Sequence, residues 1–354
     1  MFKKIGLLIL VLFALIIGYF VLWPSPIDPE AWTPPKAPEL KGIYQQNDKL
    51  AALELLFTGQ CDKCEDVAID SVGKIYGGQL NGDIVEFYQG KRRVVANTGG
   101  RPLGLDFDLM GNLIVADAGA GLLSINRTSG AITVLVDTYK GKKMIFVDDV
   151  EVAADGKMYF SDASNKWGFQ ENKMDILEGR GNGLLYEYNP TTKETTLLLD
   201  DLRFANGIAV AHDQSYVLVN ETGRYRTHRY WLAGPKAGQS DLFIENLPGF
   251  PDGISQGEDG LYWLAIVSPR DEGLDGIANN VFLKNVVAKM PAFLQPAATH
   301  YGFVLGIDGN GKIVHNLQNP SGKFAENTSV QQVGGEIYIG SLYENGLAKM
   351  TIPK

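Results

Sequence analysis

The chain has 354 residues, of which 45% are apolar, a composition typical of a globular protein with a sizeable core. Its formal net charge of −9 argues against a nucleic-acid partner, because a phosphate backbone selects a clustered basic face. The length permits several domains, but all-β folds of this size often form one unit. Nothing in the composition indicates an oligomeric state.

The N-terminus predicts a membrane anchor. Lys3 and Lys4 precede an uncharged run from Ile5 to Trp23, roughly the twenty residues that span a bilayer. A cleaved signal peptide, the alternative, has a shorter apolar core and small residues at its cleavage site. We therefore expect residues 1–23 to form a cytoplasmic tip and an uncleaved anchor. The two lysines predict a cytoplasmic N-terminus, with the globular part in a periplasm or lumen.

Residues 24–50 are rich in proline and charge, as in PSPIDPEAWTPPKAPELKG. Proline-rich segments of this kind adopt extended conformations and serve as spacers. The sequence therefore predicts a linker that lifts a domain over residues 51–354 away from the membrane.

The chain has two cysteines, Cys61 and Cys64, in a CxxC spacing. A zinc site would need further Cys or His ligands at suitable spacing, and the four histidines form no such pattern. A thioredoxin-type redox pair would lie in a βαβ unit, which the neighbouring sequence does not resemble. A local disulfide that stiffens the loop before Glu65 is the favoured interpretation, and two inert thiols are the alternative.

Strand-sized alternation of apolar and polar residues, with turn signals every eight to twelve residues, runs through residues 51–354. Inner hairpins such as VAIDSVGKIYGG alternate with second hairpins such as DIVEFYQGKRRVVA. Two hairpins make a four-stranded sheet, and repeated sheets of this period are typical of a β-propeller. We expect an all-β, six-bladed β-propeller, closed by pairing of GLAKMTI near the C-terminus with LELLFTG at residues 53–59.

Two connections are unusually long, at residues 162–183 and 266–301. Long loops in a compact fold are commonly lids or binding loops. The spacing of apolar residues over 281–294 is compatible with a short helix. That helix either packs on the rim of the propeller, walls an apolar substrate pocket or touches the membrane.

One short phrase, a lead residue placed two positions before an apolar residue, opens every inner hairpin. We call its first residue the lead residue, and the six are Glu65, Leu103, Asp148, Asn206, Asp252 and Thr328. In equivalent blades these side chains would converge at one mouth of the central channel. Asn or Asp before Gly is also a common turn signal, which could explain one or two copies. Crowded carboxylates repel each other without a cation. Oxygen-only ligands select Ca²⁺ or Mg²⁺, and a roomy site built from loops favours Ca²⁺. The predicted metal ligands are Glu65, Asp148, Asn206 and Asp252.

Several phrases give the chain a family resemblance, namely GGRPLGLDFD, NGLLYEYNP, FANGIAV to ETGRYR, RYWLAGPKAG, NLPGFPDGIS and IYIGSL. It resembles the strictosidine synthase-like proteins, which belong with the gluconolactonase and paraoxonase hydrolases, and in particular their membrane-anchored branch. The resemblance covers about residues 53–354. It implies a six-bladed propeller with calcium-dependent esterase or lactonase activity, and ligands at the four positions named above.

Two departures from these relatives bear on the chemistry. Thr328 stands about where plant strictosidine synthase has its catalytic glutamate, which argues against alkaloid synthesis. Leu103 stands where paraoxonases place a histidine. The catalytic candidates are therefore Asp252, preferred as general base, and Asp149. The candidate substrate-binding residues are Arg101, Leu103, Trp167 and Thr328, and Arg101 could equally brace its loop.

The sequence thus favours a Ca²⁺-dependent hydrolase of small-molecule esters or lactones, tethered to a membrane. Two other functions stay open. One is a non-catalytic binding or scaffold propeller whose calcium only fixes the loops, since propellers host many functions. The other is a redox protein that acts through Cys61 and Cys64.

Overall fold

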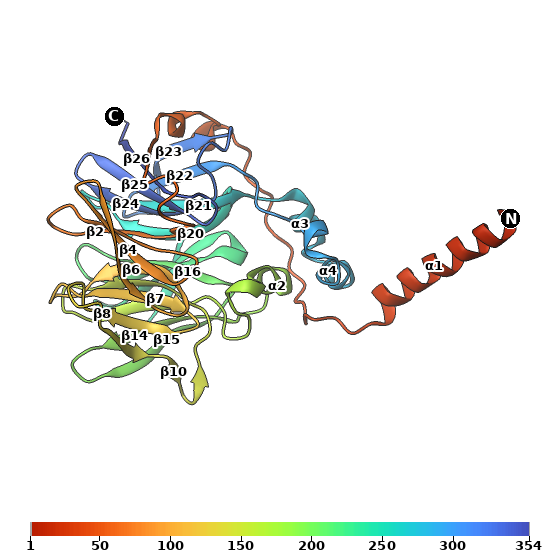
Figure 1. Ribbon diagram of the computed structural model, residues 1–354, viewed down its shortest axis with the longest axis horizontal. Coiled ribbons are helices and arrows are strands. Elements are labelled where there is room, and N and C mark those ends of the chain that lie inside the picture. The colour runs from red at the N-terminus through yellow and green to blue at the C-terminus, as the bar shows by residue number, and fades with distance from the viewer. Residues whose placement is uncertain (1, 354) are drawn as a thin grey trace.

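The computed structural model describes residues 2–353 and shows a six-bladed β-propeller (Figure 1). Each blade is a four-stranded antiparallel sheet, and the innermost strands of successive blades contact one another in a closed ring. The fold class predicted from the repeated hairpins is therefore confirmed.

The first three blades follow the chain in order, with each blade starting at the axis. Their strands are β2 (Val67–Ile69), β3 (Ile75–Gly78), β4 (Asp83–Tyr88) and β5 (Lys91–Asn97); β6 (Arg101–Phe107), β7 (Leu113–Ala118), β8 (Gly121–Ile125) and β9 (Ile132–Val136); β12 (Val147–Val152), β13 (Met158–Asp162), β14 (Gly183–Asn189) and β15 (Glu194–Leu202). A separate short hairpin, β10 (Thr138–Tyr139) with β11 (Lys142–Lys143), precedes blade three.

Blades four and five repeat this order, and the sixth joins the two ends of the domain. The strands are β16 (Ala205–Val210), β17 (Tyr216–Glu221), β18 (Arg226–Trp231) and β19 (Ser240–Ile244); β20 (Gly249–Gln256), β21 (Tyr262–Pro269), β22 (Gly302–Ile307) and β23 (Ile313–Asn319); β24 (Asn327–Val333), β25 (Glu336–Ser341), β26 (Leu347–Thr351) and β1 (Glu54–Leu56). Glu54 lies opposite Lys349, so the closure expected from the sequence is present.

Apolar side chains from neighbouring sheets fill the space between the blades. Trp263 of β21 is fully buried, and it packs in one cluster with Val330 of β24 and Ile337 of β25. Side chains alternate along a strand, so each sheet presents apolar residues to both of its neighbouring blades. This packing sets the blades around the axis and fixes where each innermost strand begins.

β-Bulges occur at the lead residues. In β12, for example, Val147 pairs with Asp162 and Val150 with Phe160, so two residues, Asp148 and Asp149, face one residue of the partner strand. The register of β6, β16, β20 and β24 also shifts at the lead residue. A bulge re-aims the side chains of its extra residues. The repeated bulge therefore directs five of the six lead side chains into the central channel, whereas Glu65 lies before β2, whose register shows no shift.

Glycine after the lead residue lets the inner strands come close together. A Cβ atom at Gly253 would overlap the carbonyl oxygen of Thr328 in the next blade, and one at Gly207 would overlap the backbone of Asp252. The phrases Asn206-Gly207 and Asp252-Gly253 thus combine a polar ligand type with room for the neighbouring strand.

The long connections form the helical part of one end of the propeller (Figure 1). Residues 162–183 contain η3 (Phe169–Glu171) and α2 (Asn172–Glu178), and the insertion between β21 and β22 contains α3 (Glu272–Ile277), α4 (Val281–Ala288) and η5 (Ala292–Leu294). The short helix expected within 281–294 is present as α4. We call this end, which also carries the lead residues, the mouth face.

The N-terminal helix α1 (Phe2–Leu22) extends away from the propeller on the side of α2, α3 and α4 (Figure 1). It is long and apolar enough to cross a membrane by length and composition, and it buries no residue against the protein. The two short helices η1 (Gly42–Tyr44) and η2 (Lys49–Ala52) lead from the linker into β1.

The segment after α1 is not a free spacer, in contrast to the sequence-based expectation. Ile27 is buried, the Glu30 N–H donates to the Glu178 carbonyl at 2.9 Å, and the Trp32 N–H donates to the Ala278 carbonyl at 3.1 Å. Lys284 Nζ donates to the Glu30 carbonyl at 2.7 Å. Proline and charge predict a solvated chain, but these residues bind the mouth face through backbone hydrogen bonds and through partly exposed ion pairs such as Glu30–Arg203.

Candidate metal centre and apolar cavity

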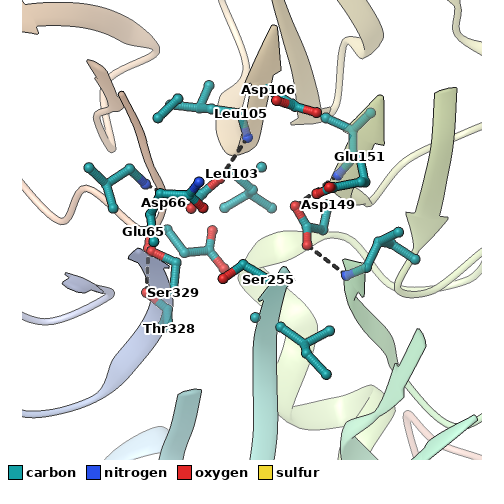
Figure 2. Close-up of a pocket in the computed structure, with 18 of the residues that line it drawn as sticks. Glu65, Asp66, Leu103, Leu105, Asp106, Asp149, Glu151, Ser255, Thr328 and Ser329 are labelled. Atoms are coloured by element: carbon teal, nitrogen blue, oxygen red, sulfur yellow. Dashed lines mark hydrogen bonds between the residues drawn. The ribbon is translucent and has the colours of Figure 1, made fainter. Parts of the chain in front are cut away.

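The central channel is lined by all six lead residues, as the sequence predicts. Figure 2 shows side chains that reach into this channel from different blades, among them Glu65, Leu103, Asp149 and Thr328. The lead residues lie at the beginning of the innermost strands, so they mark the end of the channel at the mouth face.

The four residues predicted as metal ligands are buried there. Glu65 is 7% exposed, Asp148 3%, and Asn206 and Asp252 4% each. Among residues 2–353, Glu65 Oε2 and Asp252 Oδ1 find no hydrogen-bond partner. Buried carboxylate oxygens ordinarily have partners, because an unsatisfied one costs about 1–3 kcal/mol or more. Oxygen donors without a protein partner fit the hard cation that the sequence predicts.

Burial and mutual repulsion raise the pKa values of these carboxyl groups. Burial raises the pKa of Glu65 to about 7, against the opposing effect of the Arg101 guanidinium. Burial, followed by the charges of Glu65 and Asp252, raises the pKa of Asp148 well above its ordinary value. The pKa of Asp252 is raised in the same way, by burial and then by Glu65, and a hydrogen bond from Asn206 opposes the shift. A divalent cation would remove this repulsion.

The geometry is not that of a finished coordination shell. In residues 2–353, no group of three or more His, Cys, Asp and Glu side chains could hold a metal ion as the side chains stand. The structure thus gathers the predicted donors around one channel mouth, and the ligand set of Glu65, Asp148, Asn206 and Asp252 stays a prediction.

An apolar cavity of about 250 Å³ lies directly on the lead residues. Glu65, Leu103, Asp148, Asn206 and Asp252 line both this cavity and the channel. The other walls are mainly apolar and come from the long connections and the blade edges, including Phe146, Phe169, Ile176, Phe204, Phe250, Leu274 and Val287. Pockets that are largely apolar, with a few polar groups at one end, are the usual form of small-molecule sites.

Arg101 braces the loop before Glu65. Its guanidinium donates to the Lys63 carbonyl at 2.7 Å and to the Gly78 carbonyl at 3.3 Å, and the side chain is 4% exposed. Arg101 is also absent from the residues that line the cavity. Of the two roles expected from the sequence, the contacts favour the bracing one over substrate binding.

Asp149 also makes structural contacts. Its Oδ1 accepts the N–H of Val150 at 2.8 Å, and its Oδ2 accepts the N–H of Ile208 in the next blade at 2.8 Å. Asp149 lines the channel but not the apolar cavity. With both oxygens engaged, Asp149 is a weaker candidate for general base than Asp252, whose Oδ1 is free among the described residues.

The remaining predicted substrate-binding residues differ in position. Leu103 is buried and lines the floor of the cavity. Thr328 lines only the channel, where its hydroxyl donates to the Glu65 carbonyl at 2.6 Å. Trp167 lies outside the cavity lining, because its indole N–H donates to Glu178 at 2.9 Å and its side chain packs against the cluster of Ile27, Leu177 and Ala288. Substrate contact by Trp167 is therefore not supported.

Sequence reasoning missed two acidic residues of the cavity wall, Asp271 and Glu326. Glu326, directly before β24, lines the cavity, and burial raises the pKa of its carboxyl group. His300 Nε2 lies 3.7 Å from Glu326 Oε1. The position of Glu326 just before the last inner strand was the only signal, and it lies outside the lead register.

Cys61 and Cys64 form a disulfide with a Cα–Cα distance of 5.5 Å, and both are fully buried. The favoured interpretation of the CxxC pair is thus confirmed. The cross-linked loop ends directly before Glu65, and its Lys63 carbonyl accepts the bond from Arg101.

The sequence of the chain is similar to that of proteins of one known family. Family models for strictosidine synthase and for the N-terminal part of strictosidine synthase-like proteins match residues 148–235 and 42–87. The adipocyte plasma membrane-associated protein of Rattus norvegicus is 31% identical over 362 residues, which cover 95% of this chain and 96% of the relative. The family resemblance seen in the sequence phrases is confirmed.

Solved structures with the same fold are more distant. A gluconolactonase from Xanthomonas campestris superposes with a TM-score of 0.63 at 17% identity, covering 94% of this chain and 99% of that chain. The calcium-binding protein regucalcin from Agrobacterium tumefaciens gives a TM-score of 0.60 at 14% identity, covering 84% and 92%. At these identities the similarity shows the shared propeller fold.

Proposed function

The chain belongs to the strictosidine synthase-like family, and we propose that it is a Ca²⁺-dependent hydrolase of esters or lactones whose active site is the mouth of the propeller. One observation carries the proposal. Two buried carboxylate oxygens, Glu65 Oε2 and Asp252 Oδ1, lie without a partner among residues 2–353 at the floor of an apolar cavity.

The donor set suits calcium. Glu65, Asp148, Asn206 and Asp252 offer only oxygen, and Ca²⁺ takes six to eight oxygen ligands in flexible geometry, whereas softer metals select Cys or His. Regucalcin, a structural neighbour, is described as a calcium-binding protein. When bound, the ion polarises the substrate carbonyl and stabilises the oxyanion that develops on it.

The protein's own groups perform the remaining tasks. The apolar walls, with Phe169 and Phe204 among them, bind the hydrocarbon part of the substrate and exclude water from it. The Asp252 carboxylate accepts a proton from the attacking water as the oxygen of that water bonds to the carbonyl carbon. The acyl–oxygen bond then breaks, and the proton passes to the departing alkoxide, which gives a carboxylic acid and an alcohol.

The Pictet–Spengler reaction of strictosidine synthase is a poor fit to this site. Thr328, which stands about where that enzyme has its catalytic glutamate, has no carboxylate, and its hydroxyl donates to the Glu65 carbonyl. Glu326 supplies a carboxylate on the cavity wall, but it lies two residues before that position. Redox chemistry at Cys61 and Cys64 has equally little support, because both sulfurs are buried beside Gly77 rather than at the cavity.

We propose that the protein is anchored by α1 with its N-terminus in the cytoplasm and the propeller outside it. Helix α1 and the membrane-associated relatives support the anchor itself. The disulfide supports an oxidising compartment for the propeller, since such bonds are rare in reducing cytosol.

The test is hydrolysis of a panel of aryl esters and lactones by the full chain, with calcium or with a chelator. We expect chelation to abolish activity, and Asp252→Asn to lower kcat by about a hundredfold or more. The matched control is Asp155→Asn, at an exposed turn of the opposite end, which should leave the rate unchanged.

Activity that survives the chelator and the Asp252→Asn change would contradict the proposal. Calcium binding without hydrolysis of any substrate in the panel would identify the chain instead as a binding propeller with structural calcium.

A further inference from the structure

The end of α1 contacts the insertion that forms one wall of the apolar cavity. Lys289, directly after α4, donates from Nζ to the Phe20 carbonyl of α1 at 2.9 Å, and the Tyr19 hydroxyl donates to the Lys289 carbonyl at 3.3 Å. The insertion that contains α4 supplies Leu274, Val287 and the stretch from Gln295 to Ala298 to the cavity. The end of the anchor therefore lies beside one wall of the proposed active site.

A short tether holds the mouth face near the bilayer. Only residues 23–26 separate the end of α1 from the buried Ile27, and an extended chain spans at most about 3.5 Å per residue. Beyond Ile27 the chain is fixed, because the Arg224 guanidinium lies 4.2 Å from the Trp32 ring and Arg203 pairs with Glu30 at 3.1 Å. The propeller thus cannot turn its mouth away from the membrane without breaking these contacts.

The insertion presents large apolar side chains to its surroundings. Phe282 is 55% exposed, Phe293 84% and Leu294 59%. Phe293 and Leu294 directly precede the residues Gln295–Ala298 of the cavity wall. These exposed apolar groups lie on the insertion that α1 contacts, and the adjacent apolar helix identifies the bilayer as their partner.

We propose that the insertion from α3 to η5 is seated in the interface of the bilayer that α1 spans, and that the cavity draws a lipophilic substrate from it. The substrate class is an ester or lactone with a long hydrocarbon chain, which partitions into the membrane and enters the apolar cavity beside Phe293. The reaction is the same hydrolysis by water, so this substrate class rests on the proposed function, whereas the seating of the insertion does not.

The seating is tested on the full chain in nanodiscs that contain brominated lipid, with single cysteines carrying a fluorescent thiol probe. Phe293→Cys places the probe on the insertion, and Met110→Cys places it on an exposed turn at the opposite end of the propeller. The native cysteines are bonded to each other and do not react. We expect brominated lipid to quench the probe at position 293 at least about twofold and to leave the probe at position 110 unchanged.

The substrate class is tested with two esters of one chromophore, a dodecanoyl ester in the bilayer and a water-soluble acetyl ester. Phe293→Asp combined with Leu294→Asp should lower hydrolysis of the dodecanoyl ester about tenfold relative to the acetyl ester. The matched control, Leu109→Asp with Met110→Asp on the far turn, should leave that ratio unchanged.

If brominated lipid does not quench the probe at position 293, the insertion does not lie in the bilayer interface, and this part of the proposal is wrong. Self-quenching between labelled copies, with no effect of brominated lipid, would instead show that the insertion contacts a second copy of the chain. An unchanged ratio of the two ester rates would overturn the substrate class. If neither ester is hydrolysed while position 293 is quenched, the hydrolase proposal and its substrate class fall, and the membrane seating stands.

Discussion

Asp149 in blade three accepts the backbone N–H of Ile208 in blade four at 2.8 Å. The same contact recurs around the channel, where Asp66 accepts the N–H of Leu105 at 2.8 Å and Asp106 accepts that of Val152 at 2.7 Å. Neighbouring innermost strands belong to different sheets, so these carboxylates satisfy backbone groups that no β-ladder reaches. The acidic residues of the channel therefore divide into those that join the blades and those left free at the mouth.

Removal of the Asp149 carboxylate should cost stability more than catalysis. Asp149→Ala leaves the N–H groups of Val150 and Ile208 without partners, and we expect the free energy of unfolding to fall by about 2–4 kcal/mol. Asp149→Asn, which keeps one acceptor oxygen, should lose less. Urea denaturation measures the effect, and the rate per folded molecule should change by less than about tenfold. Full stability with a lost rate would instead make Asp149 the general base.

Calcium should stabilise the protein more strongly at higher pH. Burial raises the pKa of Glu65 from its ordinary 4.5 to about 7, so without metal the folded state keeps a proton that the unfolded state has released between these values. The free energy of unfolding of the metal-free protein therefore falls as pH rises through this window. Calcium takes the place of the proton and removes that loss.

Thermal unfolding with calcium and with a chelator, at about pH 5 and about pH 8, measures this linkage. We expect the calcium-induced rise in Tm to be small at the lower pH and large at the higher one. A rise that is independent of pH would show that the ion binds away from Glu65.

Loss of the disulfide should weaken the site without changing the chemistry. Cys61→Ser with Cys64→Ser opens a small loop, for which chain entropy predicts a loss of about 2 kcal/mol. The loop holds the Lys63 carbonyl against Arg101 and ends at Glu65, so calcium affinity should also fall. Calorimetric titration measures the affinity. Saturating calcium should restore the rate, and a rate that stays lost would support a redox role for the pair.

The fold was predictable because the strands and turns of a propeller appear as local patterns of apolar, polar and turn residues in the sequence. The alternation of strands and turns gave six inner hairpins, and the apolar strands near the two ends gave the closure of β1 with β26. The polar lead residues located the channel mouth, because equal offsets from the strand start place side chains at the same level in each blade. The phrases that carry the resemblance, such as NLPGFPDGIS, indicate the same family as the similarity over the whole chain.

Other features were not predictable because they depend on partners distant in sequence. Glu30 looked like part of a solvated linker, but it meets Arg203, and its backbone meets Glu178 and Lys284. The long loop that carries Trp167 predicts contact with substrate, but a hydrogen bond to Glu178 holds the side chain outside the cavity lining. A pattern of residue types cannot reveal such pairings across the fold.

The central claim, that the lead residues hold a calcium ion at the floor of the apolar cavity, is tested most directly by a crystal structure with calcium and its anomalous signal. The account predicts one ion about 2.3–2.6 Å from oxygens of Glu65, Asp148, Asn206 and Asp252. An ion bound elsewhere, or an empty mouth at saturating calcium, would contradict it.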